Sequence, residues 1–296
     1  MWMLCIVLLT ALTTPARAGD AVGAFAPYED LLEVLAPLTS HLNDDLYRFP
    51  APRDPTGHDL FRLSLARFEG WEKRFPSSFR DVTAFGRAEA LERLGEYQLA
   101  TDAYRQVAQM PASTLADAAK TNAVRTAGFA AAAALSEDGP DLDGRLKVLR
   151  KKLDAFGRLV EQHAGTPYQA LALVEEERLE GLTSSLVVAH RRLLDKGTET
   201  AERALRFLIQ KHAESKNLAN HILRLGDFYA DLAREYADTN SRALAFKEDA
   251  FVARSDRALD VYRKVATWDG AREKPEGQGS FASFEAYKAI VLADHR

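Results

Sequence analysis

Apolar residues recur along this chain at intervals of three and four, a spacing that gathers them on one face of an α-helix. The pattern predicts helices over residues 28–42, 61–75, 79–94 and 96–110. Three prolines fall within residues 48–59, and because proline removes a backbone donor and fixes φ, we expect a loop there. Alanine, leucine, glutamate and arginine dominate while β-branched runs are scarce, which favours helix over strand. The sequence therefore predicts an all-α protein.

Gly95 marks the boundary between two of these helices. A glycine inside a helix destabilises it by about 1 kcal/mol relative to alanine, so Gly95 fits better in the turn of a helical hairpin. The small residues Ala88 and Ala100 would let the two helices approach closely, and Tyr97 and Tyr104 would fill the space between them. Neither helix covers its own apolar stripe, so each hairpin needs a neighbouring hairpin.

The order of residues in this hairpin resembles the tetratricopeptide repeat. In that family helix A carries small and large residues in a fixed order, and helix B follows a glycine with an aromatic residue, an alanine and a second aromatic residue. Val107 stands where the repeat usually has a small residue. Pro111 lies one position before the place where the repeat has its proline after helix B. The resemblance implies a tetratricopeptide-like α-solenoid built of helical hairpins. The matching residues are Ala88, Leu91, Gly95, Tyr97, Ala100 and Tyr104.

Other segments fit halves of the same repeat. Residues 222–229 fit helix A and residues 258–265 fit helix B, with about twenty extra residues between these halves. We therefore expect longer helices there, or an insertion. An earlier helix B half is carried by Phe61, Ser64, Phe68, Trp71 and Pro76.

The resemblance suggests how the chain is divided. It is good over residues 59–111, fair over 218–268 and degenerate over 112–217. Residues 19–58 would form an N-terminal helix and the proline-rich loop, and residues 59–296 would form the repeat array.

Helix punctuation supports hairpins where the repeat fades. Residues 166–169 place threonine, proline and glutamine in the order of a capping box, which predicts a helix start. Gly197 follows LLDK and suits a helix C-terminus. Residues 280–291 place Phe281, Phe284, Tyr287 and Val291 on one helical face. We expect this segment to be a C-terminal capping helix with a solvated outer side.

The first eighteen residues, MWMLCIVLLTALTTPARA, have the features of a signal peptide. A short apolar run precedes Pro15 and the small-x-small sequence at 16–18, so we expect cleavage after Ala18 and an exported protein, periplasmic or extracellular. A retained membrane anchor is the less favoured alternative, because the run is shorter than the roughly 20 residues that span a bilayer. Cleavage would remove Cys5, the sole cysteine, and Arg17, which takes the net charge from −4 to −5. This mildly acidic balance argues against a nucleic-acid partner.

Residues that would indicate catalysis or a cofactor are scarce. None of the seven histidines forms a ligand pair at helical spacing, and the sequence has no Walker loop, nucleophile elbow or haem motif. We therefore expect no metal and no cofactor. The acidic run 175–177 could supply a general acid if it were buried, but we expect it on a solvated helix face.

The tetratricopeptide resemblance also implies a concave groove that binds protein or peptide partners. The helix A positions that would line it are Phe85, Glu89 and Glu92 in one unit and Asn220, Leu223 and Asp227 in another. Family members that bind C-terminal carboxylates carry asparagine where Glu89 and Asp227 stand here. We therefore expect a basic or apolar extended partner segment, because like charges would repel an acidic one.

These features predict an exported, non-catalytic helical-repeat scaffold that binds another protein, with a role in cell-envelope assembly. The alternative is an envelope enzyme, for example one that acts on peptidoglycan, which carries a helical superhelix beside its catalytic domain.

Overall fold

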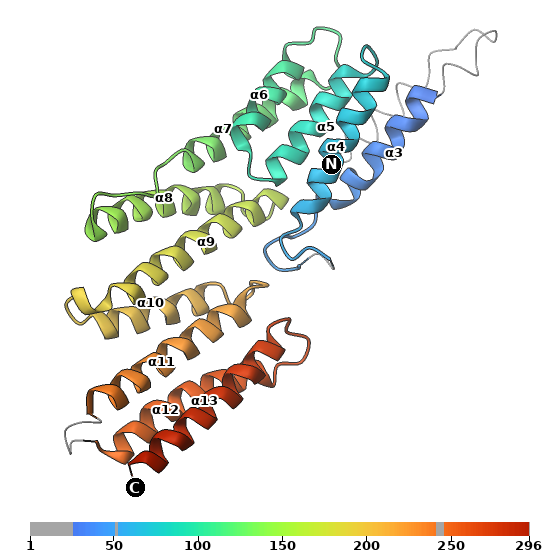
Figure 1. Cartoon of the computed structure of the whole chain (residues 1–296). Helices are drawn as coiled ribbons and strands as arrows, with labels where there is room; N and C mark the ends of the chain where they lie inside the picture. Colours follow the sequence, from blue (N-terminus) through green and yellow to red (C-terminus); the bar gives the residue numbers. More distant parts are fainter. Residues whose placement is uncertain (1–25, 51–52, 241–245, 296) are drawn as a thin grey trace. The chain divides into compact units, whose positions relative to one another are not determined.

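The computed structural model describes residues 26–50, 53–240 and 246–295, and every regular element in these ranges is a helix (Figure 1). The predicted all-α fold is confirmed. In chain order the α-helices are α3 (Ala26–His41), α4 (His58–Arg74), α5 (Arg80–Arg93), α6 (Tyr97–Ala108), α7 (Ala116–Ala133), α8 (Leu142–Gln162), α9 (Pro167–Ala189), α10 (Gly197–Lys211), α11 (Leu218–Asn240), α12 (Glu248–Ala266) and α13 (Lys274–Asp294), with a short 3₁₀ turn, η2 (Arg191–Leu193), before α10.

The chain forms two compact units. The N-terminal unit comprises the residues up to Glu137 together with Arg150–Glu175, and the C-terminal unit comprises Asp138–Leu149 and Glu176–Arg296. Helices α8 and α9 each contribute residues to both units.

In the N-terminal unit consecutive helices pack against one another, from α3 on α4 through to α6 on α7. The first core lies between α3, α4 and α5 and contains Leu38, Phe68 and Trp71, all fully buried. The indole Nε1 of Trp71 donates a hydrogen bond to the carbonyl oxygen of Pro27 (3.2 Å), which ties α4 to the start of α3. Helix α3 therefore pairs with α4 as a hairpin.

The hairpin predicted around Gly95 is confirmed. Helix α5 ends at Arg93 and α6 begins at Tyr97, while Gly95 has a φ of 79°, a left-handed conformation that glycine adopts without steric penalty. Ala88 and Ala100 are fully buried in the core that joins α5 to α6, as expected from their size.

The C-terminal unit repeats this organisation, with α10, α11, α12 and α13 each packed on the next. Helix α11 has 23 residues and α12 has 19, so the extra length in this part of the chain lies largely in longer helices. Phe284 and Val291 of α13 are buried against α11 and α12, and Phe281 and Tyr287 pack on the same core. The predicted terminal helix with one apolar face is therefore confirmed.

Two predictions of helix punctuation need correction. Gly197 is the first residue of α10, not the end of the preceding helix. A Cβ at this position would lie 1.7 Å from the carbonyl oxygen of Arg191, so the close approach of the backbone requires glycine. Helix α9 does begin at Pro167, but the capping box does not form as predicted. The hydroxyl of Thr166 donates to the carbonyl of His163 (2.7 Å), and the Gln169 side chain accepts from the backbone N–H of Gly165 (3.2 Å).

Candidate partner-binding surfaces

The predicted groove residues of the N-terminal unit share one face of α5, but they differ in exposure. Phe85 is 4% exposed, and its ring packs edge-on against Tyr104 at 5.3 Å between centroids. Glu92 is 2% exposed. Glu89, between them, is partly exposed. Of the three residues, only Glu89 has some exposed surface, although its Oε2 atom is buried.

The Glu92 carboxylate is fully occupied by neighbouring groups. Arg125 of α7 donates to it through Nη2 (2.7 Å to Oε2) and Nε (3.1 Å to Oε1), and the hydroxyls of Thr126 and Tyr104 lie 3.1 and 3.3 Å away. The Arg125 guanidinium also stacks on the Tyr168 ring, 3.6 Å from its centroid. Glu92 therefore joins α5 to α7 and is not free to bind a ligand.

Glu89 lies next to this network, but the network donates no hydrogen bond to its Oε2 atom. Its Oε2 atom is buried and has no hydrogen-bond partner. Burial and the nearby charge of Glu92 raise the pKa of Glu89 to about 8, although Arg93 and Arg125 act in the opposite direction. The carboxyl group is thus mostly protonated at neutral pH. An unpaired buried polar atom is unusual and marks this position for functional attention.

The predicted residues of the C-terminal unit also divide by exposure. Leu223 is 3% exposed and belongs to the core, whereas Asn220 and Asp227 are exposed on α11. Asp227 Oδ1 accepts a hydrogen bond from the Tyr262 hydroxyl of α12 (2.7 Å). In this unit the polar members of the predicted set remain available for contact.

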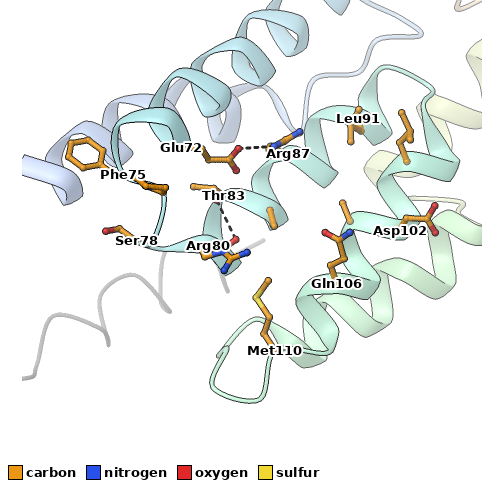
Figure 2. A pocket seen from close by; sticks show the side chains of 14 residues that line it. Glu72, Phe75, Ser78, Arg80, Thr83, Arg87, Leu91, Asp102, Gln106 and Met110 are labelled. Carbon is orange, nitrogen blue, oxygen red and sulfur yellow. Dashed lines mark hydrogen bonds and ion pairs between the residues drawn. The ribbon is translucent and has the colours of Figure 1, made fainter.

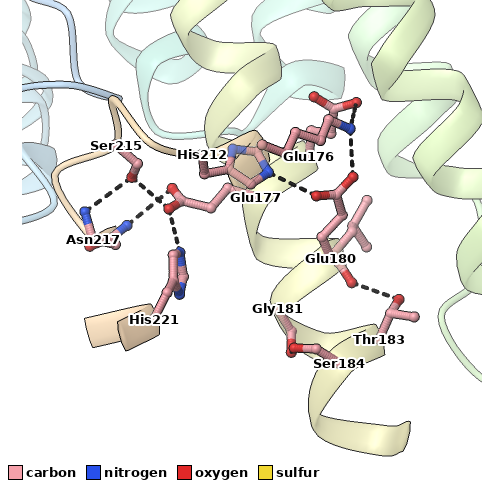
Figure 3. Close-up of polar contacts among 12 residues, drawn as sticks. Glu176, Glu177, Glu180, Gly181, Thr183, Ser184, His212, Ser215, Asn217 and His221 are labelled. Atoms are coloured by element: carbon pink, nitrogen blue, oxygen red, sulfur yellow. Dashed lines mark hydrogen bonds and ion pairs between the residues drawn. The ribbon is translucent and has the colours of Figure 1, made fainter. Parts of the chain in front are cut away.

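The acidic run on α9 lies in a different environment from the solvated face that we expected. That expectation is wrong for Glu176 and Glu177, which are 6% and 3% exposed (Figure 3). They belong to a network that we call the α9 acidic cluster. Its members are Glu176, Glu177, Glu180, Lys211, His212, Ser215, Asn217 and His221.

One half of the α9 acidic cluster joins α9 to the end of α10. Lys211 Nζ lies 2.8 Å from Glu176 Oε1 and 2.5 Å from Glu180 Oε1, and His212 Nε2 lies 2.9 Å from Glu180 Oε2. Burial alone would raise the pKa of Glu180, but the hydrogen bonds from His212 and Lys211 outweigh it and hold the pKa below its ordinary value.

The other half is centred on Glu177. The Ser215 hydroxyl and the Asn217 amide donate to its carboxylate at 2.5 and 3.2 Å, and His221 Nε2 lies 2.6 Å from Oε1. Burial raises the pKa of Glu177, but these three contacts outweigh it and lower the pKa overall. A Ser-His-acid triad needs the histidine between the serine and the carboxylate. Here the carboxylate lies between them, so the arrangement fastens the α10–α11 connection to α9.

The sequence did contain a weak signal for this burial. Apolar residues in LALVEEERLEGLTSSLVVA are distributed around α9 instead of forming one stripe, which indicates a helix covered on more than one side. Acidic residues on such a helix cannot all face solvent.

A cavity of about 610 Å³ lies in the N-terminal unit between the end of α4, α5 and α6, and the sequence analysis did not predict a binding site there (Figure 2). Its lining is partly apolar and partly charged. The apolar members include Phe75, Ala84, Leu91, Leu99, Ala103 and Met110, and the charged members are Glu72, Arg80, Arg87 and Asp102.

Within the described ranges, no cluster of three or more histidine, cysteine or acidic residues has the geometry of a metal site, and no helix is both long and apolar enough to cross a bilayer. The predicted signal peptide, residues 1–18, lies outside the described residues.

No protein-family model matches the chain, and no curated protein matches it significantly. Among solved structures it is similar to a TPR repeats protein from Bacteroides fragilis, with 14% identity over 86% of this chain and 97% of that one and a TM-score of 0.33. The packing of this chain's own consecutive helices agrees with the all-α, tetratricopeptide-like architecture expected from its sequence.

Proposed function

We propose that this chain is a non-catalytic helical-repeat scaffold that binds a protein or peptide partner, with Glu89 receiving a basic side chain of that partner. The observation that supports this role is the buried, unpaired Oε2 of Glu89 beside a carboxylate, Glu92, whose bonding capacity is filled from within the unit. The Glu92 carboxylate is thus filled by Arg125, Thr126 and Tyr104, whereas Oε2 of Glu89 is left without a donor.

The electrostatics favour a cation as the missing group. A lysine or arginine placed beside Glu89 would stabilise its ionised form and lower its raised pKa, so binding near neutral pH would release a proton. Charge-assisted hydrogen bonds of this kind are stronger than neutral ones. The net charge of −4 also favours encounter with a basic segment. Asn220 and Asp227, exposed on α11, give the C-terminal unit its own polar contacts for such a segment.

The proposed setting is the cell envelope, where an exported repeat scaffold would hold components during assembly. The support for it is the N-terminal sequence, with its short apolar run and the small-x-small site before Gly19. Expression of the full chain with its own N-terminus in a bacterial host, followed by N-terminal sequencing of the exported product, should give a protein that begins at Gly19. A product that keeps Met1 and sediments with membranes would favour the retained anchor.

Selection of short random peptides displayed on phage, with the purified full chain as target at neutral pH, tests the binding role. We expect the selected peptides to include a family rich in lysine and arginine, and we expect Glu89→Gln to weaken their binding about tenfold or more. Gln keeps the size of the side chain and removes its charge. The matched control is Glu96→Gln, an exposed glutamate in the turn after α5, which should leave affinity unchanged. Basic peptides that bind the Glu89→Gln variant as well as the parent would refute the assignment.

A further inference from the structure

The 610 Å³ cavity is formed by a different side of α5 from the one that carries Glu89. Ala84, Arg87 and Leu91 line it, at spacings of three and four residues. Positions 87 and 89 lie about 200° apart around a helix, so the cavity and Glu89 belong to nearly opposite faces. Whatever occupies the cavity is therefore a separate ligand contact from the one proposed at Glu89.

Small residues on the helices create the space, and larger apolar residues surround it. Ala84 of α5 and Ala103 of α6 line the cavity together with Leu91, Leu99 and Met110. Leu99 is 56% exposed, a large apolar surface for one side chain of a soluble helix. Apolar side chains of a partner would gain free energy by covering it.

Among the charged side chains that line the cavity, all but Arg80 form an ion pair within the unit. Arg87 is paired with Glu72 at 2.7 Å, and Asp102 accepts from Arg105 at 3.2 Å. Across the described part of the chain, the Arg80 guanidinium has neither an ion-pair nor a hydrogen-bond partner. Figure 2 shows Arg80 at the same end of the cavity as Met110, with Asp102 toward the other end.

The position of Arg80 in its helix increases this imbalance. It is the first residue of α5, where the helix dipole already places partial positive charge, and a cation there is unfavourable. A carboxylate from outside would meet both the guanidinium and the positive end of the helix. The cavity thus combines an uncovered apolar surface with one unmatched positive charge.

From these observations we infer that the α4–α6 cavity docks a peptide segment of a partner protein in which apolar side chains flank an acidic residue. The apolar residues would cover Leu91, Leu99 and Met110, and the acidic residue would pair with Arg80. Charge complementarity decides the chemistry, because the other charged groups at the cavity already have partners within the unit.

Random short peptides displayed on phage and selected on the full chain are also the probe here. We expect a second family of binders, with an aspartate or glutamate among apolar residues, that is distinct from the basic family expected at Glu89. Leu99→Lys should weaken this acidic family more than about tenfold, and Arg80→Glu should weaken it about three- to tenfold. Selection on the Arg80→Glu variant should replace the acidic residue with lysine or arginine.

Matched controls on α4 keep the charge and polarity changes but move them away from the cavity. Arg67→Glu and Leu63→Lys alter an exposed arginine and a leucine that is 50% exposed, and both should leave the acidic family bound. The inference is overturned if no selected family depends on both Arg80 and Leu99, or if the control substitutions weaken binding equally. Peptides that depend on Glu89 alone would overturn the inference and leave the proposed function standing.

Discussion

Burial raises the pKa of both Glu89 and Glu177, and the neighbouring groups decide whether that effect is offset. Glu177 is surrounded by the donors Ser215, Asn217 and His221, which keep its carboxylate charged. Glu89 has no donor on its buried oxygen and a second carboxylate, Glu92, nearby. The donors to Glu177 lie 38 to 44 residues further along the chain, in the α10–α11 connection and in α11, so helical spacing alone cannot predict its protonation state.

Replacing Glu89 with glutamine should stabilise the protein in alkaline solution. Its folded-state pKa, about 8, lies above the ordinary value of 4.5, so the folded state binds more protons than the unfolded state between pH 4.5 and 8. The contribution of Glu89 to the free energy of unfolding is fully present below pH 4.5 and is lost as pH rises through 8. Urea unfolding should give Glu89→Gln and the parent similar stability at pH 4.5. At pH 9 the variant should be more stable by about 2 to 4 kcal/mol. A difference that stays constant with pH would contradict the assigned environment of Glu89.

Close approach between helices is achieved by the same means in both units. A Cβ on Gly86 of α5 would lie 2.5 Å from the Phe68 ring of α4, and a Cβ on Gly226 of α11 would lie 2.7 Å from the Tyr262 ring of α12. In each case a glycine on one helix receives an aromatic ring from the neighbouring helix. The tetratricopeptide resemblance had included Gly226, Tyr262 and Phe68 in its pattern, and the packing gives that pattern a steric reason.

Gly226→Ala should therefore destabilise the protein although alanine is the better helix former. Helix propensity favours the substitution by up to about 1 kcal/mol, but the Tyr262 ring must move and its hydroxyl bond to Asp227 is disturbed. We expect a net loss of about 1 to 3 kcal/mol in the free energy of unfolding. Gly279→Ala in α13 is the control, because a Cβ there has open space, and it should stabilise by about 0.5 to 1 kcal/mol. Equal effects at the two glycines would refute the packing argument.

At the scale of the molecule, the sequence predicted the succession of helices better than the contacts that hold them together. Periodicity and the glycine at 95 were sufficient for the first hairpins, since both report local geometry. The groove residues Phe85, Glu92 and Leu223 were chosen by repeat position, and each is buried by partners from other helices. The 610 Å³ cavity was missed because it depends on small residues of α5 and α6 facing the end of α4. Such contacts are tertiary, and a single sequence taken by itself does not reveal them.

The α9 acidic cluster predicts how acid will affect the C-terminal unit. The pKa values of Glu177 and Glu180 lie below the ordinary value of 4.5, so their stabilising contribution is present above that pH and is lost as pH falls below it. Combined Glu177→Gln and Glu180→Gln substitution should remove that contribution, because a neutral amide accepts weaker hydrogen bonds than a carboxylate. We expect the free energy of unfolding of the double variant to be about 2 to 4 kcal/mol below that of the parent near pH 7, and this difference should become smaller toward pH 3.

Hydrogen exchange followed by mass spectrometry can locate this effect. Faster exchange near pH 7 should appear first in peptides that cover the end of α10 and the start of α11, because the cluster joins both to α9. Glu285→Gln, which changes an exposed glutamate of α13, should leave exchange in those peptides unchanged. Protection of the α10–α11 connection that survives the double substitution near pH 7 would mean that apolar packing alone fixes it. The buried carboxylates would then need another explanation, and a ligand-binding role for the α9 acidic cluster would be the next hypothesis to test.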